Sequence, residues 1–130
     1  MEKRVIIERA KDGTFSCYAE KEMDFVNAIF GYGNTAEEAK ADFLEAYNEA
    51  VLEFGENAGY TFVFAYDVPS FLQSFSKKFS LAGLQTITGI NRKQLSHYIN
   101  GNSRPSKRTV EKMERGIKDF EVELKNISFV

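Results

Sequence analysis

The sequence predicts an α+β protein in which a β-β-β-α-β unit is followed by an all-helical unit. Alternating apolar and polar residues near the amino terminus are typical of half-buried strands, and strand signals stop at Tyr66, after which apolar residues recur at helical spacing. The chain has 130 residues, of which 43% are hydrophobic and 14% aromatic, so it can bury one ordinary core or two small ones. We expect two domains, over residues 1–67 and 68–130.

The first predicted strands form a hairpin. Residues 5–10 are rich in β-branched side chains, residues 11–13 (Lys-Asp-Gly) supply turn chemistry, and apolar residues alternate with polar ones over residues 15–21. A third strand is expected between Phe25 and Tyr32. The aromatic and β-branched run over residues 60–66 predicts a fourth strand, whose rings belong to the core or to an interface.

A helix is predicted between the third and fourth strands. Thr35 and Glu38 have the spacing of a capping box, in which the threonine hydroxyl accepts from a first-turn amide and the glutamate reaches back to the cap. Gly55 is placed to end the helix. Its apolar stripe comprises Ala39, Phe43, Ala46, Tyr47, Ala50, Val51 and Phe54.

The second half of the chain reads as a series of capped helices. Asp67 can cap a helix that has Pro69 in its first turn. Asn91 and Gln94 repeat the capping-box spacing. Ser80 and Ser106 can cap the starts of two further helices, and Gly89 and Gly101 are placed to end the helices that precede them. The expected buried residues are Phe71, Leu72, Phe75 and Phe79 in the first helix and Val110, Met113, Ile117, Phe120 and Leu124 in the last.

The net charge of −2 hides a strong asymmetry. Residues 1–66 contain six basic and thirteen acidic residues, giving −7, whereas residues 67–130 contain eleven basic and six acidic residues, giving +5. Between Lys77 and Lys118 the charge is +8. Such segregation is typical of a nucleic-acid-binding module beside a different kind of domain, although a basic segment can also be only a solvated face.

Several classes of protein are disfavoured. The longest stretch without charge, residues 79–91, is shorter than the ~20 apolar residues of a membrane span, and the first residues lack a signal-peptide pattern, so we expect a cytoplasmic protein. One cysteine, Cys17, and one histidine, His97, provide neither an internal disulfide, a thiolate zinc cluster nor a Cys/His catalytic pair. We expect Cys17 to be a buried small apolar residue, and no cofactor is predicted.

The most specific chemical signal lies in residues 80–101. Leu84, Ile87 and Ile90 can lock a first helix against a second that buries Leu95, Tyr98 and Ile99, with Gly89 in the turn; this is the pattern of a helix-turn-helix. The exposed side of the second helix then presents residues able to read bases in the major groove of double-stranded DNA, and its free amino-terminal amides favour phosphate. The predicted base-reading residues are Arg92, Lys93, Ser96, His97 and Asn100, and the predicted backbone contacts are Arg104, Lys107 and Arg108. His97 could also be an ordinary surface residue.

Two resemblances follow from these residues. Residues 84–101, followed by Arg104-Pro105-Ser106, resemble the Cro/repressor type of helix-turn-helix. The first half, with its Asp12-Gly13 turn and the helix opening at Thr35-Ala36-Glu37-Glu38-Ala39, is similar to the HicB antitoxin family. The resemblance implies a degraded ribonuclease-H-like domain without enzymatic activity, joined to a DNA-binding module. It implies the antitoxin of a type II toxin–antitoxin system, which binds a small basic HicA-like mRNA-cleaving toxin and represses its own operon.

Two alternatives stay open. The chain could be a stand-alone dimeric transcriptional regulator whose first domain senses a ligand or only dimerises. It could also be a hydrolase, which would require carboxylates such as Glu8, Asp12, Glu38 and Asp42 to converge on a metal. For DNA binding we expect a homodimer, or a higher homo-oligomer, that reads an inverted repeat with half-sites about one or two helical turns apart.

Overall fold

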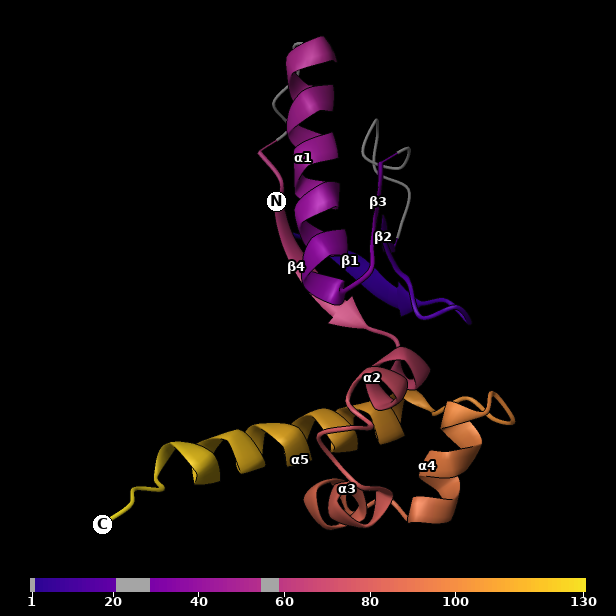
Figure 1. Ribbon diagram of the computed structural model, residues 1–130, viewed down its shortest axis with the longest axis vertical. Helices are drawn as coiled ribbons and strands as arrows, with labels where there is room; N and C mark the ends of the chain where they lie inside the picture. The colour runs from indigo at the N-terminus through magenta and orange to yellow at the C-terminus, as the bar shows by residue number, and fades with distance from the viewer. Residues whose placement is uncertain (1, 21–28, 55–58) are drawn as a thin grey trace. The chain divides into compact units, whose positions relative to one another are not determined.

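The computed structural model describes residues 2–20, 29–54 and 59–130 and has a mixed α+β fold with a four-stranded sheet and five helices (Figure 1). The elements follow the predicted order, with the last four helices after the final strand. They are β1 (Glu2–Arg9), β2 (Phe15–Ala19), β3 (Phe30–Gly33), α1 (Ala36–Phe54), β4 (Thr61–Tyr66), α2 (Val68–Ser74), α3 (Leu81–Thr88), α4 (Arg92–Ile99) and α5 (Lys107–Lys125).

The sheet has the strand order β3-β2-β1-β4. β1 and β2 form the predicted hairpin, whose turn is held by Asp12: its Oδ1 accepts from the backbone N–H of Thr14 at 2.9 Å and from the Thr14 hydroxyl at 2.7 Å. β1 begins at Glu2, three residues before its predicted start at Val5, because it also pairs in parallel with β4, from Glu2 opposite Thr61 onwards. That pairing is non-local and leaves no mark on the local sequence pattern.

The other predicted strands and helix ends fall partly outside the described residues. Of the strand expected between Phe25 and Tyr32, residues 25–28 lie outside the described residues; β3 begins at Phe30 and continues to Gly33. β2 ends at Ala19 rather than Lys21, which lies outside the described residues, as does the predicted helix stop Gly55.

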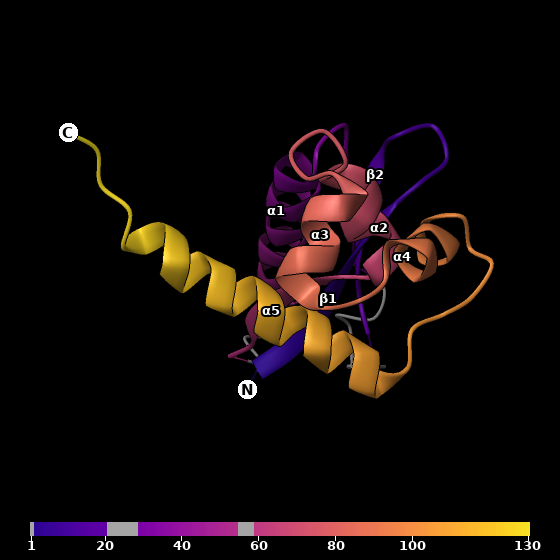
Figure 2. The same ribbon diagram turned by 90° about the horizontal axis from the view of Figure 1, so that it is seen from below.

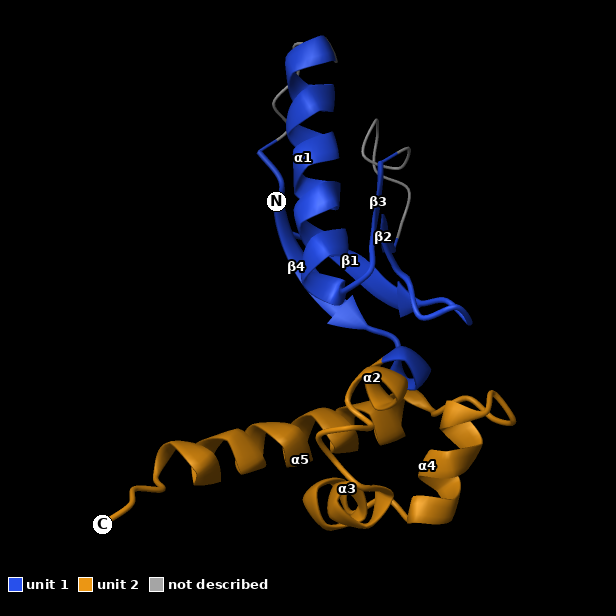
Figure 3. Cartoon of the chain, viewed as in Figure 1, with its two compact units in different colours: residues 1–70 blue, residues 71–130 orange. Residues whose placement is uncertain are grey.

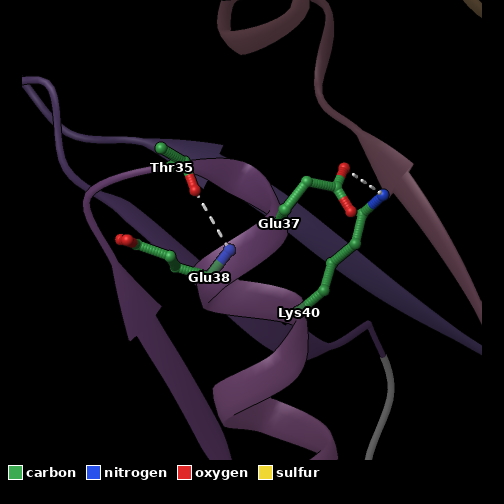
Figure 4. A network of polar contacts seen from close by, with 4 residues as sticks. All are labelled: Thr35, Glu37, Glu38 and Lys40. Atoms are coloured by element: carbon green, nitrogen blue, oxygen red, sulfur yellow. Dashed lines mark hydrogen bonds and ion pairs between the residues drawn. The ribbon is translucent and has the colours of Figure 1, made fainter.

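The predicted cap of α1 is confirmed at its first bond and corrected at its second. The Thr35 hydroxyl accepts from the backbone N–H of Glu38 at 3.1 Å (Figure 4). The Glu38 carboxylate does not return to Thr35; it accepts from the backbone N–H of Asn34 at 2.7 Å, one residue earlier. The same turn carries an ion pair of 3.2 Å between Lys40 and Glu37. The start of α1 is therefore fixed together with the loop that enters it.

α1 packs on one face of the sheet and closes the first core. Phe43 is fully buried and meets the rings of Phe62 and Phe64 edge to face, with centroids 5.1 and 6.1 Å apart. The helix lies directly on β3, since a Cβ atom added to Gly31 would stand 2.3 Å from the carbonyl oxygen of Ala39. The aromatic run of β4 is thus core, and Cys17 is buried in the same cluster as predicted.

The chain divides into two compact units, residues 1–70 and residues 71–130, which we call unit 1 and unit 2 (Figure 3). The division falls three residues after the expected boundary at Asp67. Asp67 does cap α2, accepting from the Ser70 N–H at 2.8 Å, and the Ser70 hydroxyl in turn accepts from the Arg9 N–H at 2.8 Å. The first turn of α2 is therefore tied to the sheet.

Unit 2 is built from the rest of α2 and from α3, α4 and α5. Its buried apolar residues are Leu72, Leu84, Ile90, Leu95, Tyr98 and Met113. α2 ends at Ser74, so Phe79 lies beyond it, where its ring meets the Phe120 ring at 6.0 Å. The expectation that Leu124 is buried is wrong, because its side chain is 51% exposed at the free end of α5. None of the described helices is both long and apolar enough to cross a membrane.

Candidate nucleic-acid interface

α3 and α4 form a tightly joined pair of helices. The Ser80 hydroxyl accepts from the Gly83 N–H at 2.9 Å at the start of α3, and Gly89 ends it with a left-handed φ of 74°. The buried Thr88 hydroxyl donates to the Leu84 carbonyl at 2.7 Å and accepts from the Ile90 N–H at 3.1 Å. The two hydrogen bonds of the Thr88 hydroxyl thus help to fix the path between the helices. α4 runs across the direction of α3 (Figures 1 and 2).

α4 has one buried and one open side. Leu95 is fully buried and Tyr98 is 4% exposed, as the apolar pattern predicts. The predicted base-reading residues lie on the remaining surface: Arg92, Lys93 and Asn100 are exposed, and Ser96 and His97 are half-buried. Lys93, Ser96, His97 and Asn100 recur at helical spacing, so they share one face, and Arg92 flanks it at the first turn.

The predicted backbone-contacting residues follow in the next segment. Arg104 is exposed in the loop after α4, and Lys107 and Arg108 are exposed in the first turn of α5. Ser106 caps that turn by accepting from the Thr109 N–H at 3.2 Å. Two cationic side chains at the start of a helix are placed where the helix dipole already attracts anions.

Within the described part of the chain, the basic side chains of this surface form no ion pair with an acidic residue. Ion pairs between described residues include those of Arg4 with Glu20, Lys40 with Glu37 and Lys125 with Glu121, and no described acidic residue pairs with any of the five cations of the surface. These cations are Arg92, Lys93, Arg104, Lys107 and Arg108. Their charge is therefore available to an external anion.

Sequence reasoning missed the residues that hold α4 in place. The Gln85 side chain of α3 accepts from the Arg92 N–H at 2.8 Å, and the Gln73 side chain of α2 donates to the Ile99 carbonyl at 3.0 Å. Lys112 of α5, which the sequence offers only as one more positive charge, donates to the Gly89 carbonyl at 3.1 Å. Both ends of α4 are thus fixed by contacts between helices, which no local pattern signals.

Two expectations about the start of α4 need correction. Asn91 caps the helix by accepting from the Lys93 N–H at 2.8 Å, but Gln94 does not complete a capping box; its amide donates to the Ser103 hydroxyl at 3.2 Å. The predicted free amides are also partly occupied, since Gln85 and Asn91 take those of Arg92 and Lys93. The cationic side chains, more than the helix end itself, make this surface attractive to phosphate.

Unit 1 presents an acidic groove between β3 and α1. Its volume is about 620 Å³, and its lining includes the carboxylates Glu38, Asp42 and Glu45. Asp42 accepts from the Tyr32 N–H at 2.8 Å, so it covers a backbone donor of the edge strand. In the same strand Phe30 and Tyr32 are 48% and 64% exposed, and Tyr32 also lines the groove. The described residues contain no group of three or more His, Cys, Asp or Glu side chains arranged to hold a metal ion.

Comparison of the chain with protein-family models, with curated proteins and with solved structures finds no match.

Proposed function

We propose that the protein is a DNA-binding transcriptional repressor that also acts as the antitoxin of a type II toxin–antitoxin system. The observation that carries the proposal is the open face of α4, where Arg92, Lys93 and Asn100 are exposed while Leu95 and Tyr98 anchor the opposite side. In this reading α3 and α4 form a helix-turn-helix, and α4 enters the major groove.

The chemistry of this face suits base recognition. Arginine and lysine donate to O6 and N7 of guanine, and asparagine forms a bidentate pair with adenine. Arg104, Lys107 and Arg108 would contact the flanking phosphates and set the register of the helix on the duplex. Ser96 and His97, which share the face of α4 with Lys93 and Asn100, would make further contacts with the bases.

The antitoxin role draws on unit 1 and on the resemblance to HicB antitoxins. Residues 1–66 carry −7, and their acidic groove at β3 has the charge sign to attract a small basic ribonuclease of the HicA kind. Complementary charge mainly raises the rate of association and selects the partner. In this reading unit 1 has a degraded ribonuclease-H-like fold, works without metal or cofactor and binds rather than cleaves.

The DNA-binding role is tested with the full chain and matched substitutions. Operator fragments are selected from random duplexes, and affinity is then measured over a range of salt. Arg92→Ala should cost about 1–3 kcal/mol on the selected operator and relax preference at one base pair. Lys107→Ala should weaken all sequences alike and flatten the salt dependence. Lys11→Ala, which removes an exposed cation from unit 1, is the control.

The antitoxin role is tested separately. The tagged chain is recovered from its native cells, and a small basic companion is sought near equal stoichiometry. A companion that arrests growth when expressed alone, and is neutralised by both the native chain and the Arg92→Ala variant, supports the antitoxin. Operator binding without any companion would leave the second candidate, a stand-alone dimeric regulator. If Arg92→Ala and Lys107→Ala both left the operator affinity unchanged, the assignment of α4 to the major groove would be wrong.

A further inference from the structure

β3 is an edge strand of the sheet, and among the described strands it pairs with β2 alone (Figure 1). The backbone N–H of Tyr32 points away from β2, because it donates to the Asp42 carboxylate at 2.8 Å. Hydrogen-bonded and free positions alternate along an antiparallel pair, so the backbone groups of Phe30 point to the same free edge, while Gly31 and Gly33 bond to β2. In the described part of the chain, no other strand pairs with this edge.

The two faces of β3 offer different surfaces beside the free edge. A Cβ atom added to Gly31 or Gly33 would meet α1, so alternation along the strand directs the side chains of Phe30 and Tyr32 to the other face. Both aromatic residues are exposed, and their rings stack with centroids 6.5 Å apart. On the α1 side the edge borders the acidic groove. The carboxylates that line this groove are Glu38, Asp42 and Glu45.

The Asp42 carboxylate protects the edge while no partner is bound. Charged groups beside an edge strand prevent unwanted pairing, and Asp42 does so by occupying the Tyr32 N–H. No described cation forms an ion pair with Asp42 or Glu45. The carbonyl of an added strand can replace the carboxylate at the Tyr32 N–H, and Asp42 can then pair with a cation of that strand.

We propose that an extended segment of a partner protein, in which basic residues alternate with apolar ones, adds to the free edge of β3 as a fifth strand. Main-chain hydrogen bonds supply affinity in this mode of binding, and alternate side chains supply specificity. The basic side chains enter the groove, and the apolar ones cover Phe30 and Tyr32. The inference rests on the partner-binding role proposed for unit 1, and it adds where and how the partner is held.

The charge of the groove selects the occupant. Three carboxylates beside the edge favour a basic segment and disfavour an acidic one. The β3 strand of a second copy is a poor occupant, because residues 30–33 (Phe-Gly-Tyr-Gly) contain no basic residue and the copy would bring its own acidic groove against the first. A nucleic acid is disfavoured for the same reason, since its phosphates are negative.

The full chain, labelled with nitrogen-15, is titrated with a synthetic peptide in which lysine and valine alternate, and the amide chemical shifts are followed by NMR. The shifts should change saturably, chiefly at the backbone amides of β3 and of the α1 residues beside the groove. A block peptide, with all its lysines before all its valines, has the same composition and charge. It should bind at least about threefold more weakly, because its lysines cannot all face the groove while its valines cover the rings.

Methylation of the peptide backbone tests strand addition directly. Backbone groups of successive residues in an added strand point alternately toward the sheet and toward solvent. Of two isomers of the alternating peptide, one N-methylated on its valines and the other on its lysines, one should therefore lose saturable binding and the other should keep it. Equal effects of the two modifications, or shift changes confined to residues away from β3 and the groove, would overturn the proposal.

Substitutions of the chain test the role of the groove. Asp42→Asn with Glu45→Gln should raise the dissociation constant of the alternating peptide at least about threefold, because two exposed ion pairs are lost. The asparagine keeps an oxygen that can accept from the Tyr32 N–H. Glu2→Gln with Glu53→Gln is the matched control, since it removes the same charge from exposed residues of unit 1 outside the groove lining. Similar losses in both double variants would show long-range attraction without docking at β3.

Failure of this inference and failure of the proposed function are distinguishable. A toxic companion that the native chain and the Asp42→Asn, Glu45→Gln variant bind equally well would keep the antitoxin role and place the partner elsewhere on the chain. Peptide binding at β3 in cells that yield no companion would keep the docking site and remove the antitoxin role. A free chain that sediments as a dimer and does not respond to the peptide would assign the edge to self-association and contradict the proposal.

Discussion

The Oε1 atom of Gln85 in α3 accepts a 2.8 Å hydrogen bond from the backbone N–H of Arg92, the first residue of α4. The bond joins the two helices at the point where α4 would meet DNA. It also occupies an amide that has no partner within its own helix. The orientation of the candidate recognition helix therefore depends on a side chain of the preceding helix.

Gln85→Ala should lower the free energy of unfolding by about 0.5–1.5 kcal/mol, because the Arg92 N–H loses its acceptor. Gln85→Glu keeps an acceptor in place and adds negative charge at a helix start, where it is favourable, so its stability should equal or exceed that of the native chain. Urea unfolding of the three proteins makes the comparison. Equal losses in both variants would mean that side-chain packing, not the hydrogen bond, is what Gln85 contributes.

Gly116 lies where the backbone of α5 approaches the backbone of α3 closely. A Cβ atom at this position would lie 2.4 Å from the Ile87 carbonyl oxygen and 2.9 Å from the Thr88 Cα, and both neighbours are backbone atoms that cannot easily move aside. In an open helix a change from glycine to alanine stabilises by about 1 kcal/mol, but Gly116→Ala should instead destabilise the chain by at least that amount.

Gly83→Ala is the control for Gly116→Ala. Gly83 is also helical, but the nearest atom to a Cβ atom added there would be the Ser80 hydroxyl oxygen at 3.2 Å, the tip of a side chain. The substitution should leave the free energy of unfolding unchanged or raise it by up to about 1 kcal/mol. Thermal unfolding measures both variants, and similar stabilities for the two would contradict the close packing of α5 on α3.

The sequence predicts those parts of the fold that depend on neighbouring residues. The caps at Ser80, Asn91 and Ser106 all form, because each needs only its own side chain and an amide two or three residues on. The bonds by which Glu38 and Gln94 were expected to complete the capping boxes are mispredicted. Glu38 accepts from the Asn34 N–H and Gln94 donates to the Ser103 hydroxyl, because the partner within reach depends on the path of a loop. Local chemistry fixes where helices begin, and tertiary structure decides the remaining bonds.

In the candidate site, too, some features follow from the local sequence and others depend on tertiary contacts. Helical periodicity is enough to separate the open face of α4 from its buried side at Leu95 and Tyr98. The side chains that hold α4 are not predictable in this manner, because Gln73 and Lys112 act on backbone carbonyls 26 and 23 residues away. The extent of β1 and the exposure of Leu124 are likewise set by what lies beside them in space.

The division between the units gives a prediction about fragments. A fragment of residues 1–70 should be more stable than one of residues 1–67, because Ser70 is 3% exposed and its hydroxyl accepts from the Arg9 N–H in β1. The difference should be about 1 kcal/mol or more. Urea unfolding followed by circular dichroism compares the fragments.

Ser70→Ala in the longer fragment isolates the hydroxyl. If that bond ties the start of α2 to the sheet, the variant should lose a large part of the difference between the two fragments. A variant as stable as the parent fragment would assign the difference to chain length or to the packing of Val68 and Pro69.

Burial raises the pKa of the Cys17 thiol to about 11, from an ordinary value of 9.0. The folded protein thus favours the neutral thiol, and the stability that this provides is complete below about pH 9 and is lost as the pH rises toward 11. Tyr18, whose pKa is raised to about 12 by burial and by a hydrogen bond to Glu8, adds to the loss at higher pH. Unfolding by urea should therefore require less denaturant at about pH 10 than at about pH 8. Cys17→Ala should reduce this pH dependence whatever its effect on absolute stability, and a variant that kept the full dependence would assign it to the tyrosines alone.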